Sequence, residues 1–476
     1  MVDRGQAATG AASQLVAGAA GGPSREDLLR WDREHVWHAF TQMAEYEPLL
    51  FERAHGCTLV DLDGREYLDG TSSLWCNVHG HCHPRIDAAI RDQLTRVAHT
   101  TSLGTSNSTT VRLARRLVEI APDGLNHVFF SGDGSSSVEV ALKMAFQYWQ
   151  QRADPRPEKT RYVALADAYH GDTIGSVSVG GVARFHAMFR PLLFDVIRAP
   201  APAVYRAPAD APNSASPGQL AEFYLASVER ILQEQHHEIA ALVVEPLVQA
   251  AAGMLVHPRG YLRGLRELTR RYDVLLIADE VAVGFGRTGR MFACEHEDVS
   301  PDFLCLGKGI TGGYLPLAAT LTTTAVWQAF LGTAGEQRQF FHGHTYGGNP
   351  LAAAAALASL AIFDEEHVLA ELKPKIARMA EHLARIAQHP NVGDVRQCGL
   401  IGAVELVQDR ATKEPPAWEE QRGARVCRYA REEGVMVRPL GNIVVVMPPL
   451  AIRIEELDQI LLAVEHGIPR AMQSAD

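Results

Sequence analysis

Leu275-Leu-Ile-Ala-Asp-Glu-Val-Ala-Val-Gly-Phe-Gly-Arg-Thr-Gly289 is the stretch that most strongly indicates the architecture of this chain, and Phe303-Leu-Cys-Leu-Gly-Lys308 follows it closely. Each begins with a short continuous apolar run, which is typical of a strand buried on both faces of a parallel sheet. A reactive charge comes at or just after the end of each run, Asp279 in the first and Lys308 in the second. Open parallel sheets bind ligands at the carboxyl ends of their strands. The two stretches therefore predict an α/β fold with a site at that edge of the sheet.

On both sides of these stretches, apolar runs alternate with helical patterns. The spacing of apolar residues predicts helices over 111–120 and 138–150. Further strands are predicted at His127-Val-Phe-Phe, Tyr162-Val-Ala-Leu, Ala241-Leu-Val-Val and Leu317-Ala-Ala-Thr-Leu. Such a series favours a large domain, residues 84–348, with a mostly parallel sheet covered by helices on both faces.

The two ends of the chain are predicted to build a smaller α+β domain. In residues 25–83, Cys57-Thr-Leu-Val followed by an Asp-Gly turn indicates a hairpin. Residues 349–476 contain an Ala-rich run, a charged helix near 373–387 and the short strand Ile443-Val-Val-Val-Met. Residues 1–24, rich in Ala, Gly and Ser, are interpreted as a disordered leader. The segments 152–158 and 199–217 are interpreted as surface loops.

The composition excludes several classes of protein. With 476 residues, of which 47% are hydrophobic and 21% charged, the chain is expected to be soluble and globular. A net charge of -11 argues against a nucleic-acid partner, and no apolar stretch is long enough to predict a membrane span. Seven cysteines, an odd number in a long chain, suit reduced thiols in a cytoplasm.

Four junctions at strand ends carry residues with chemical potential, and each has an ordinary interpretation as well. Ser131-Gly-Asp-Gly-Ser-Ser precedes a helix, whose unpaired N–H groups could bind a phosphate, although the loop could equally be a simple cap. Asp279 could pair with a protonated ring nitrogen, or cap the next turn. Lys308 could form a Schiff base, or be a solvated loop lysine. Tyr169 could cover a flat ligand, or simply pack.

Together the four junctions supply what none supplies alone. A phosphate cradle, an aromatic face, a carboxylate for a pyridine nitrogen and a Schiff-base lysine are the groups that an enzyme using pyridoxal 5′-phosphate requires. The combination therefore predicts this cofactor.

The sequence resembles the class III aminotransferases of pyridoxal-phosphate fold type I over nearly the whole chain after residue 25. The resemblance rests on the motif that runs from Leu276 to Gly289 and on Lys308 after it. Within the class, the chain is similar to the 8-amino-7-oxononanoate aminotransferases of biotin synthesis. That similarity lies in Trp37-His-Ala-Phe-Thr-Gln-Met43, Asp69-Gly-Thr-Ser-Ser-Leu-Trp75, Val78-His-Gly80 and Cys305-Leu-Gly-Lys-Gly-Ile-Thr-Gly-Gly313.

The resemblance implies a role for each of a set of residues. Catalysis would fall to Lys308, which also holds the cofactor, with Asp279 at its ring nitrogen and Tyr169 over its ring. Further cofactor contacts would come from Gly134, Ser135 and Val281, and from His344 and Thr345 reaching the phosphate of a neighbouring subunit. The protein would thus be a homodimer with shared sites. The small-molecule substrates would be bound by Phe40, Leu74, Trp75, Tyr169, Arg287, Lys308, Gly343 and Arg438, with Arg438 receiving the carboxylate of the keto acid.

The chain departs from the usual pattern of this subfamily at a few positions. Phe40, Leu74 and Val445 stand where members that use S-adenosylmethionine usually carry Tyr, Trp and Tyr. S-adenosylmethionine is the default amino donor of the family, and these replacements resemble the branch that uses lysine. Asp133 stands in the phosphate loop where Ser is usual, and an extra acid beside a phosphate is unfavourable unless its side chain turns outward.

Three other interpretations were weighed against this one. Thiolate and imidazole groups crowd within eight residues and could suggest zinc, but no second ligand pair follows at zinc-finger spacing, so no metal is predicted; these residues are Cys76, His79, His81, Cys82 and His83. A transaminase acting on an ω-amino acid or on ornithine would keep the cofactor and change the acceptor. A regulator without catalysis is disfavoured, because every catalytic position is filled and no DNA-binding module is evident.

Overall fold

A computed structural model of the chain describes residues 22–212 and 216–473. The predicted leader, 1–24, lies outside these residues except for its last three. The described chain forms two compact units, one from residues up to 54 together with 59–67, the other from 55–58 together with 68 onward. The domain boundaries expected at 83/84 and 348/349 stay a prediction.

The first unit holds one helix and most of a hairpin. Helix α1 (Arg25–His35) begins with a capping box in which Ser24 and Asp27 bond each other's backbone N–H. A 3-10 turn, η1 (Met43–Glu45), leads to strands β1 (Phe51–His55), β2 (Thr58–Asp61) and β3 (Glu66–Asp69). The Asp61 carboxylate accepts the N–H groups of Asp63 and Arg65, each at 2.9 Å, and closes the β2–β3 turn. The hairpin prediction is confirmed.

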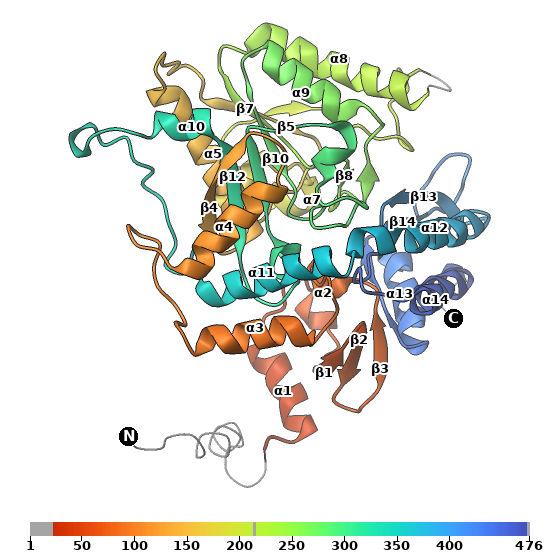
Figure 1. The fold of residues 1–476 in the computed structure, drawn as a ribbon. Helices are drawn as coiled ribbons and strands as arrows, with labels where there is room; N and C mark the ends of the chain where they lie inside the picture. Colours follow the sequence, from red (N-terminus) through yellow and green to blue (C-terminus); the bar gives the residue numbers. More distant parts are fainter. Residues whose placement is uncertain (1–21, 213–215, 474–476) are drawn as a thin grey trace, which may run out of the picture. The chain divides into compact units, whose positions relative to one another are not determined.

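The second unit contains the seven-stranded sheet that the sequence predicts (Figure 1). Its order is β4-β12-β11-β10-β7-β5-β6, and β10, β11, β7, β5 and β6 run parallel to one another. Strand β12 is antiparallel to both of its neighbours, so the sheet is mostly parallel. The bounds are β4 Leu125–Ser131, β5 Arg161–Leu165, β6 Ile197–Ala199, β7 Ile239–Val244, β10 Leu275–Asp279, β11 Phe303–Leu306 and β12 Ala318–Thr323.

Helices cover this sheet on both faces. On one face α5 packs against β7, β11 and β12, and on the other α4 packs against β4 and α9 against β10. The α-helices between residues 84 and 329 are α3 (Pro84–Leu94), α4 (Ser108–Ile120), α5 (Gly134–Gln151), α6 (Ile174–Val179), α7 (Ala183–His186), α8 (Pro217–Gln235), α9 (Tyr261–Arg271) and α10 (Thr324–Ala329). The helices predicted over 111–120 and 138–150 are confirmed.

Alternate residues of each strand pack into two separate cores. Ile277 and Phe303 belong to the core under α5, whereas Leu276 and Leu304 belong to the core on the opposite face. Side chains that alternate between two dry faces explain why the strands appear in the sequence as unbroken apolar runs.

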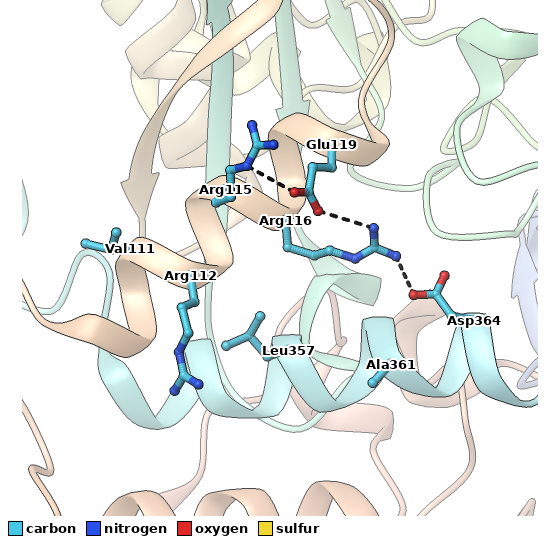
Figure 2. A pocket seen from close by; sticks show the side chains of 8 residues that line it. All are labelled: Val111, Arg112, Arg115, Arg116, Glu119, Leu357, Ala361 and Asp364. Carbon is cyan, nitrogen blue, oxygen red and sulfur yellow. Dashed lines mark hydrogen bonds and ion pairs between the residues drawn. The ribbon is translucent and has the colours of Figure 1, made fainter.

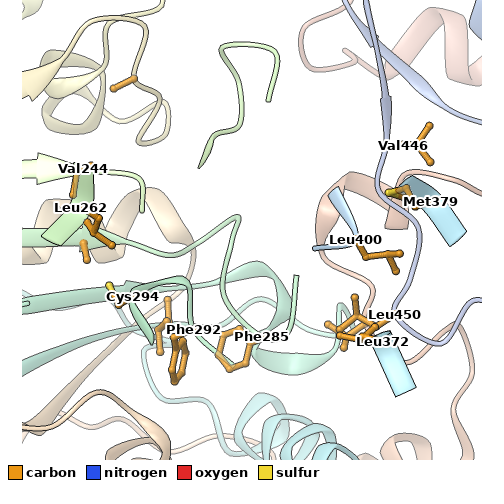
Figure 3. Packing of buried hydrophobic residues seen from close by; sticks show 14 of the residues in the cluster. Val244, Leu262, Phe285, Phe292, Cys294, Leu372, Met379, Leu400, Val446 and Leu450 are labelled. Atoms are coloured by element: carbon orange, nitrogen blue, oxygen red, sulfur yellow. The ribbon is translucent and has the colours of Figure 1, made fainter. Parts of the chain in front are cut away.

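The C-terminal segment adds helices and a second sheet to the same unit. The sheet has the order β13-β14-β17-β16, and Figure 3 shows the core beneath it, with Met379, Leu400 and Val446 close together. The same core contains Phe285 and Phe292 from the loop after β10. The bounds are α11 Pro350–Glu365, α12 Val368–Ile386, β13 Val392–Cys398, β14 Ile401–Leu406, α13 Arg422–Glu432, β15 Val435–Met436, β16 Arg438–Leu440, β17 Ile443–Val446 and α14 Ile454–Met472. Strand β15 pairs with the end of β3 through Leu68.

Within the described residues, no helix is both long enough and apolar enough to span a membrane. All seven cysteines are free thiols.

Candidate active site

The carboxyl edge of the seven-stranded sheet gathers the predicted charges. Asp279 is the last residue of β10, and it is paired in register with Cys305 of β11, three residues before Lys308. Glu245 directly follows β7. Burial lowers the pKa of Lys308, and the charges of Asp279 and Glu245 partly oppose this shift, so both carboxylates lie within electrostatic reach of the lysine.

The Asp279 carboxylate is buried, and each of its two oxygens has one hydrogen-bond partner, which leaves room for a further donor. One oxygen lies 2.8 Å from Nδ1 of His170, and the other accepts the N–H of Val281 at 3.0 Å. The side chain of His170 is completely buried, so its imidazole can orient the carboxylate without competition from water. Among the described residues, Nε2 of His170 has no hydrogen-bond partner.

Two further carboxylates lie behind this edge, and burial raises the pKa of each to about 7. Glu245 accepts the N–H groups of Tyr169 and Ala250, both at 3.0 Å. Glu280 accepts those of Ala293 and Cys294, at 2.6 and 2.8 Å. Each therefore ties a loop to the sheet edge by binding backbone amides.

The Lys308 side chain is half-buried, and burial lowers its pKa. Its Nζ lies 5.1 Å from the ring centroid of Trp75. Its backbone is in the left-handed region, with φ of 39°, at the start of the 3-10 turn η4 (Lys308–Thr311). A lowered pKa increases the fraction of free amine that can attack a carbonyl carbon.

The N-terminus of α5 forms a cradle that lacks side chains. A Cβ at Gly134 would lie 2.4 Å from Val281, so only glycine permits this approach. The hydroxyl of Ser135 lies 2.9 Å from that of Thr173. The first N–H groups of a helix have no partner within the helix, and they bind anions well.

Asp133 does not point into this cradle. Its carboxylate caps α5 by accepting the N–H of Ser136 at 2.8 Å and the hydroxyl of Ser136 at 2.9 Å. The side chain is exposed. The acid at this position therefore acts as the N-cap of α5, a role that aspartate and serine both fill well.

Tyr169 is half-buried beside this edge. Its hydroxyl donates to the carboxylate of Asp172 at 2.7 Å, and its ring is stacked 6.2 Å from that of His186. Burial and the neighbouring acids raise the pKa of Tyr169, so the hydroxyl stays protonated at neutral pH.

These residues fit pyridoxal 5′-phosphate. The glycine cradle at α5 suits a phosphate, the buried Asp279 suits a protonated ring nitrogen, and the Lys308 amine suits an aldehyde. The residues that could hold the cofactor are Gly134, Ser135, Tyr169, Asp279, Val281 and Lys308.

Leu74 and Trp75 lie on a strained turn. Ser72, Ser73 and Trp75 all have φ between 52° and 63°, which costs about 1 to 2 kcal/mol for each residue other than glycine. Trp75 is 7% exposed and Leu74 46% exposed. Trp75 packs in one apolar cluster with Val283, Val445 and Met447.

The two predicted substrate arginines differ in environment. The guanidinium of Arg287 is buried and donates to the carbonyl oxygens of Pro448 at 2.5 Å and of Asn77 at 2.6 Å. It thus joins the turn after Trp75 to the strand segment after β17. Arg438 is exposed, and within the described chain it makes no ion pair.

Four predicted residues lie on exposed backbone. Gly343, His344 and Thr345 belong to the loop before α11, and all three are exposed. Phe40 lies in the first compact unit, is 59% exposed and has φ of 54°.

The imidazoles of the His79 to His83 segment point to different partners. His79 bonds the hydroxyl of Ser359 at 3.0 Å, and His81 bonds Asp69 at 3.0 Å. Cys82 is exposed. In the described residues, no group of three or more histidine, cysteine, aspartate or glutamate side chains is arranged to hold a metal ion.

A separate hollow of about 530 Å³ lies between α4 and α11 (Figure 2). Its guanidinium groups are partly occupied by ion pairs, since Arg115 and Arg116 both contact Glu119 and Arg116 also contacts Asp364. None of the predicted site residues lines it.

Two residues of the site were missed by the sequence argument. His170 directly follows Tyr169 but was given no role, and Glu245 was not named. A usable signal existed for Glu245, because it directly follows the apolar run of β7, as Asp279 follows that of β10.

Comparison with known proteins gives a consistent result. The model of the family described as Aminotransferase class-III matches residues 41–468. The adenosylmethionine-8-amino-7-oxononanoate aminotransferase of Geobacter sulfurreducens is 53% identical over 93% of this chain and 97% of its own length. That of Nitratidesulfovibrio vulgaris is 55% identical over 94% of this chain and 82% of its own length.

Solved structures are similar over comparable lengths. The crystal structure of the adenosylmethionine-8-amino-7-oxononanoate aminotransferase of Methanocaldococcus jannaschii has a TM-score of 0.89 and 40% identity, covering 94% of this chain and 100% of that chain. An (S)-enantioselective omega-transaminase from Thermomicrobium roseum has a TM-score of 0.90 and 33% identity, covering 95% and 100%.

Proposed function

The chain belongs to the class III aminotransferases, and on that premise we propose that it transfers an amino group to 8-amino-7-oxononanoate to give 7,8-diaminononanoate. Two observations carry the proposal. At one edge of the sheet, Gly307 and Val281, the neighbours of Lys308 and Asp279 in the sequence, lie against Gly134 of the α5 cradle. The chain is also more than half identical to relatives named for this acceptor. The reaction is a step of biotin biosynthesis. We infer a cytoplasmic location from the seven free thiols.

Pyridoxal 5′-phosphate, the cofactor of this family, supplies an electron sink for the carbon that loses its proton. We assign Lys308 to hold the cofactor and to move that proton, because it lies at the sheet edge beside Asp279 and Trp75 and burial lowers its pKa. Gly134 and Ser135 would hold the phosphate of the cofactor, through the backbone N–H groups at the start of α5. Tyr169 and Val281 would hold its ring.

Asp279 keeps the ring nitrogen protonated in this proposal. Because His170 and the N–H of Val281 each bond one of its oxygens, the carboxylate has a fixed orientation, in which it would bind the ring nitrogen. Its loss should cost much more rate than affinity.

We further propose a homodimer with shared sites. Gly343, His344 and Thr345 are exposed in the single chain, and in a dimer they would reach the neighbouring site, with His344 and Thr345 at the phosphate and Gly343 at the substrate. Phe341 and Tyr346 in the same loop are 70% and 67% exposed, which gives the loop apolar surface to bury.

The acceptor rests on identity rather than on fold. The omega-transaminase from Thermomicrobium roseum matches this fold with a TM-score of 0.90, yet it is 33% identical, whereas relatives named for 8-amino-7-oxononanoate reach 55%. Arg438 is free of ion pairs in the described chain and is assigned to the carboxylate of the keto acid, whose two oxygens suit a planar guanidinium. Arg287 shapes the site indirectly, through Asn77 and Pro448.

S-adenosylmethionine is carried over from the names of the relatives as the amino donor. L-lysine is a second candidate, which three side chains favour. Phe40 has no hydroxyl to donate, Leu74 offers less aromatic surface than Trp, and Val445 is buried against the Trp75 cluster where a tyrosine hydroxyl would need a partner.

Separate half-reactions test both substrates. The purified holoenzyme is mixed with S-adenosylmethionine or with L-lysine, and the visible absorbance of the bound cofactor is followed as the amino group is transferred to it. Addition of 8-amino-7-oxononanoate should then restore the absorbance. The same amine with the Lys308→Ala variant is the matched control and should give no turnover.

The donor is the amine that removes the absorbance. If neither amine does so, or if the keto acid fails to restore it, the biotin-pathway assignment is wrong and the broader transaminase assignment takes its place.

A further inference from the structure

A buried carboxylate holds the turn that carries Trp75. Asp69 is completely buried at the end of β3, and one of its oxygens accepts the N–H groups of Thr71 and Ser73, each at 3.1 Å. The other oxygen accepts the N–H of Ser73 at 2.9 Å and lies 3.0 Å from Nε2 of His81. A single side chain thus fixes both ends of the segment from residue 71 to residue 81.

His81 extends this contact to Asn77. Its Nδ1 lies 3.1 Å from Nδ2 of Asn77, and Oδ1 of Asn77 accepts the N–H of Gly80 at 2.8 Å. The amide nitrogen of Asn77 can only donate, so Nδ1 of His81 must accept. Nε2 of His81 must then carry the ring proton and donate the hydrogen bond to Asp69. The chain Asn77–His81–Asp69 is therefore bonded with one defined direction.

The turn inside this frame is one that its sequence would not adopt alone. Ser73 has φ of 63° and ψ of -89°, close to the rare form of the three-residue turn, and Ser72 and Trp75 are also in the left-handed region. Strained backbone of this kind persists only where surrounding bonds over-determine it, and it gathers at functional sites. Here the bonds come from Asp69, from Thr71, whose hydroxyl donates to the carbonyl oxygen of Ser73 at 3.0 Å, and from Ser72, whose hydroxyl donates to that of Met447 at 2.6 Å.

The strained turn faces the reactive lysine. The ring of Trp75 lies 5.1 Å from Nζ of Lys308, while its own Nε1 is buried and has no partner in the described residues. The position of the ring is thus set by the turn and by apolar packing, and a small rotation of the turn moves the wall of the substrate pocket.

We propose that Asp69 is a positioning residue which, with His81 and Asn77, sets the place of Trp75 against Lys308 and so determines how substrate lies at the reacting atoms. The inference rests on the proposed function and adds to it a residue that touches neither substrate nor cofactor. A displacement of about 1 Å at a reacting centre can cost about 100-fold in rate.

A double-mutant cycle between Asp69 and Trp75 tests the proposal. Asp69→Asn keeps the size of the side chain but replaces one accepting oxygen by an NH2 group. That group cannot accept the hydrogen bonds that Thr71, Ser73 and His81 now donate to Asp69. We expect kcat/KM for the keto acid to fall about 10- to 100-fold in the otherwise unchanged chain, and about 3-fold or less when Trp75 is already alanine. Cofactor loading, read from visible absorbance, should stay the same.

Asp61→Asn is the matched control. Asp61 is also a buried aspartate that accepts two backbone N–H groups, but it closes the β2–β3 turn and bonds nothing in the segment 69–81. It should leave kcat/KM within about 2-fold of the unchanged chain.

A second pair of variants keeps the proposal testable if Asp69→Asn does not fold. The glutamine side chain in His81→Gln can still accept from Asn77 and donate to Asp69, as the imidazole does. The leucine side chain in His81→Leu can do neither. Gln should retain most of the activity and Leu should lose it.

The positioning role would be overturned if Asp69→Asn lowered kcat/KM by the same factor whether residue 75 is tryptophan or alanine. It would also be overturned if the kinetics of His81→Leu were unchanged. In both cases an unmodified protein that still turns over 8-amino-7-oxononanoate would leave the proposed function intact. Failure of the unmodified protein itself would reject the function instead.

Discussion

The carboxyl edge of the large sheet and the segment 69–81 both present side chains to the same lysine, but they are held by different forces. Asp279 and Lys308 come from strand ends, where parallel backbone ladders fix the chain before any side chain is considered. Trp75 comes from a turn with three left-handed residues, and side-chain hydrogen bonds to Asp69 and from Ser72 hold it.

This difference bears on how each region responds to change. A backbone ladder tolerates many side chains, so the sheet edge can keep its geometry while its reactive groups are altered. The turn at 69–81 depends on one carboxylate, so a single substitution there should change geometry without removing a reactive group.

The largest expected effect removes chemistry from the sheet edge without disturbing its ladder. Lys308→Ala should abolish multiple turnover, because the amine assigned to move the proton is removed, while the cofactor still binds through the α5 cradle. Steady-state assays and the cofactor content of the purified variant check this. Appreciable multiple turnover would contradict the assigned role of Lys308.

Asp279→Asn should have the next largest effect. The amide cannot keep a ring nitrogen protonated, so kcat should fall about 100- to 1,000-fold while KM changes little. Single-turnover kinetics measure the loss directly. A change confined to KM would show that Asp279 serves binding rather than the chemical step.

The contribution of Glu280 to stability should depend on pH, so the variant Glu280→Gln can be used to measure it. Its folded-state pKa, about 7, lies above its ordinary value, so its contribution to stability is complete below about pH 4.5 and is lost as pH rises through 7. This contribution is about 1 to 3 kcal/mol. Glu280→Gln should therefore lower the difference in thermal midpoint between pH 5.5 and pH 8.5.

The midpoints should be compared at fixed protein and cofactor concentrations, because ligand binding shifts them. The exposed Glu419→Gln is the control and should keep the original pH dependence. An unchanged difference in Glu280→Gln would mean that Glu280 stays ionised in the folded protein.

Glycine substitutions should separate the two regions more finely. Ser73→Gly relieves a left-handed residue and should leave the free energy of unfolding unchanged, or raise it by up to about 1 kcal/mol. Ala278→Gly, in the buried centre of β10, should lower it by about 1 to 2 kcal/mol. Denaturant unfolding of both variants measures the contrast, and a larger loss at Ser73 would contradict it.

The smallest effect is expected at the phosphate loop. Asp133→Ser keeps a cap on α5 and removes one negative charge near the cradle, so cofactor affinity should rise about 2- to 5-fold. Titration of the apoprotein with cofactor measures this. Asp133→Ala should instead destabilise the helix by about 1 kcal/mol, because the cap is lost.

Much of this arrangement could be predicted because strands buried on two faces leave a distinct pattern. The runs before Asp279 and Lys308 indicated both the sheet and the edge where their side chains would meet. The loop before α5 was predicted for a similar reason, since Gly134 precedes a clear helical pattern.

Contacts between distant segments could not be predicted in the same way. The bond from Arg287 to Pro448 spans 161 residues, and nothing in the local pattern of either segment indicates the other. The antiparallel direction of β12 was missed as well, because a buried strand has the same apolar composition in either direction. Left-handed serines such as Ser73 leave no compositional signal, since glycine would be the residue expected there.

The position of β12 between β4 and β11 also imposes an order in time on the newly made chain. Strand β4 lies at one edge of the sheet, and its neighbour there is β12, which begins 187 residues after β4 ends. At about 5 to 20 residues per second, the ribosome needs about 10 to 40 seconds to make that partner. During this interval Val128 and Phe130 lack the strand with which they pair, so the strand of this sheet that is made first is among the last to be completed.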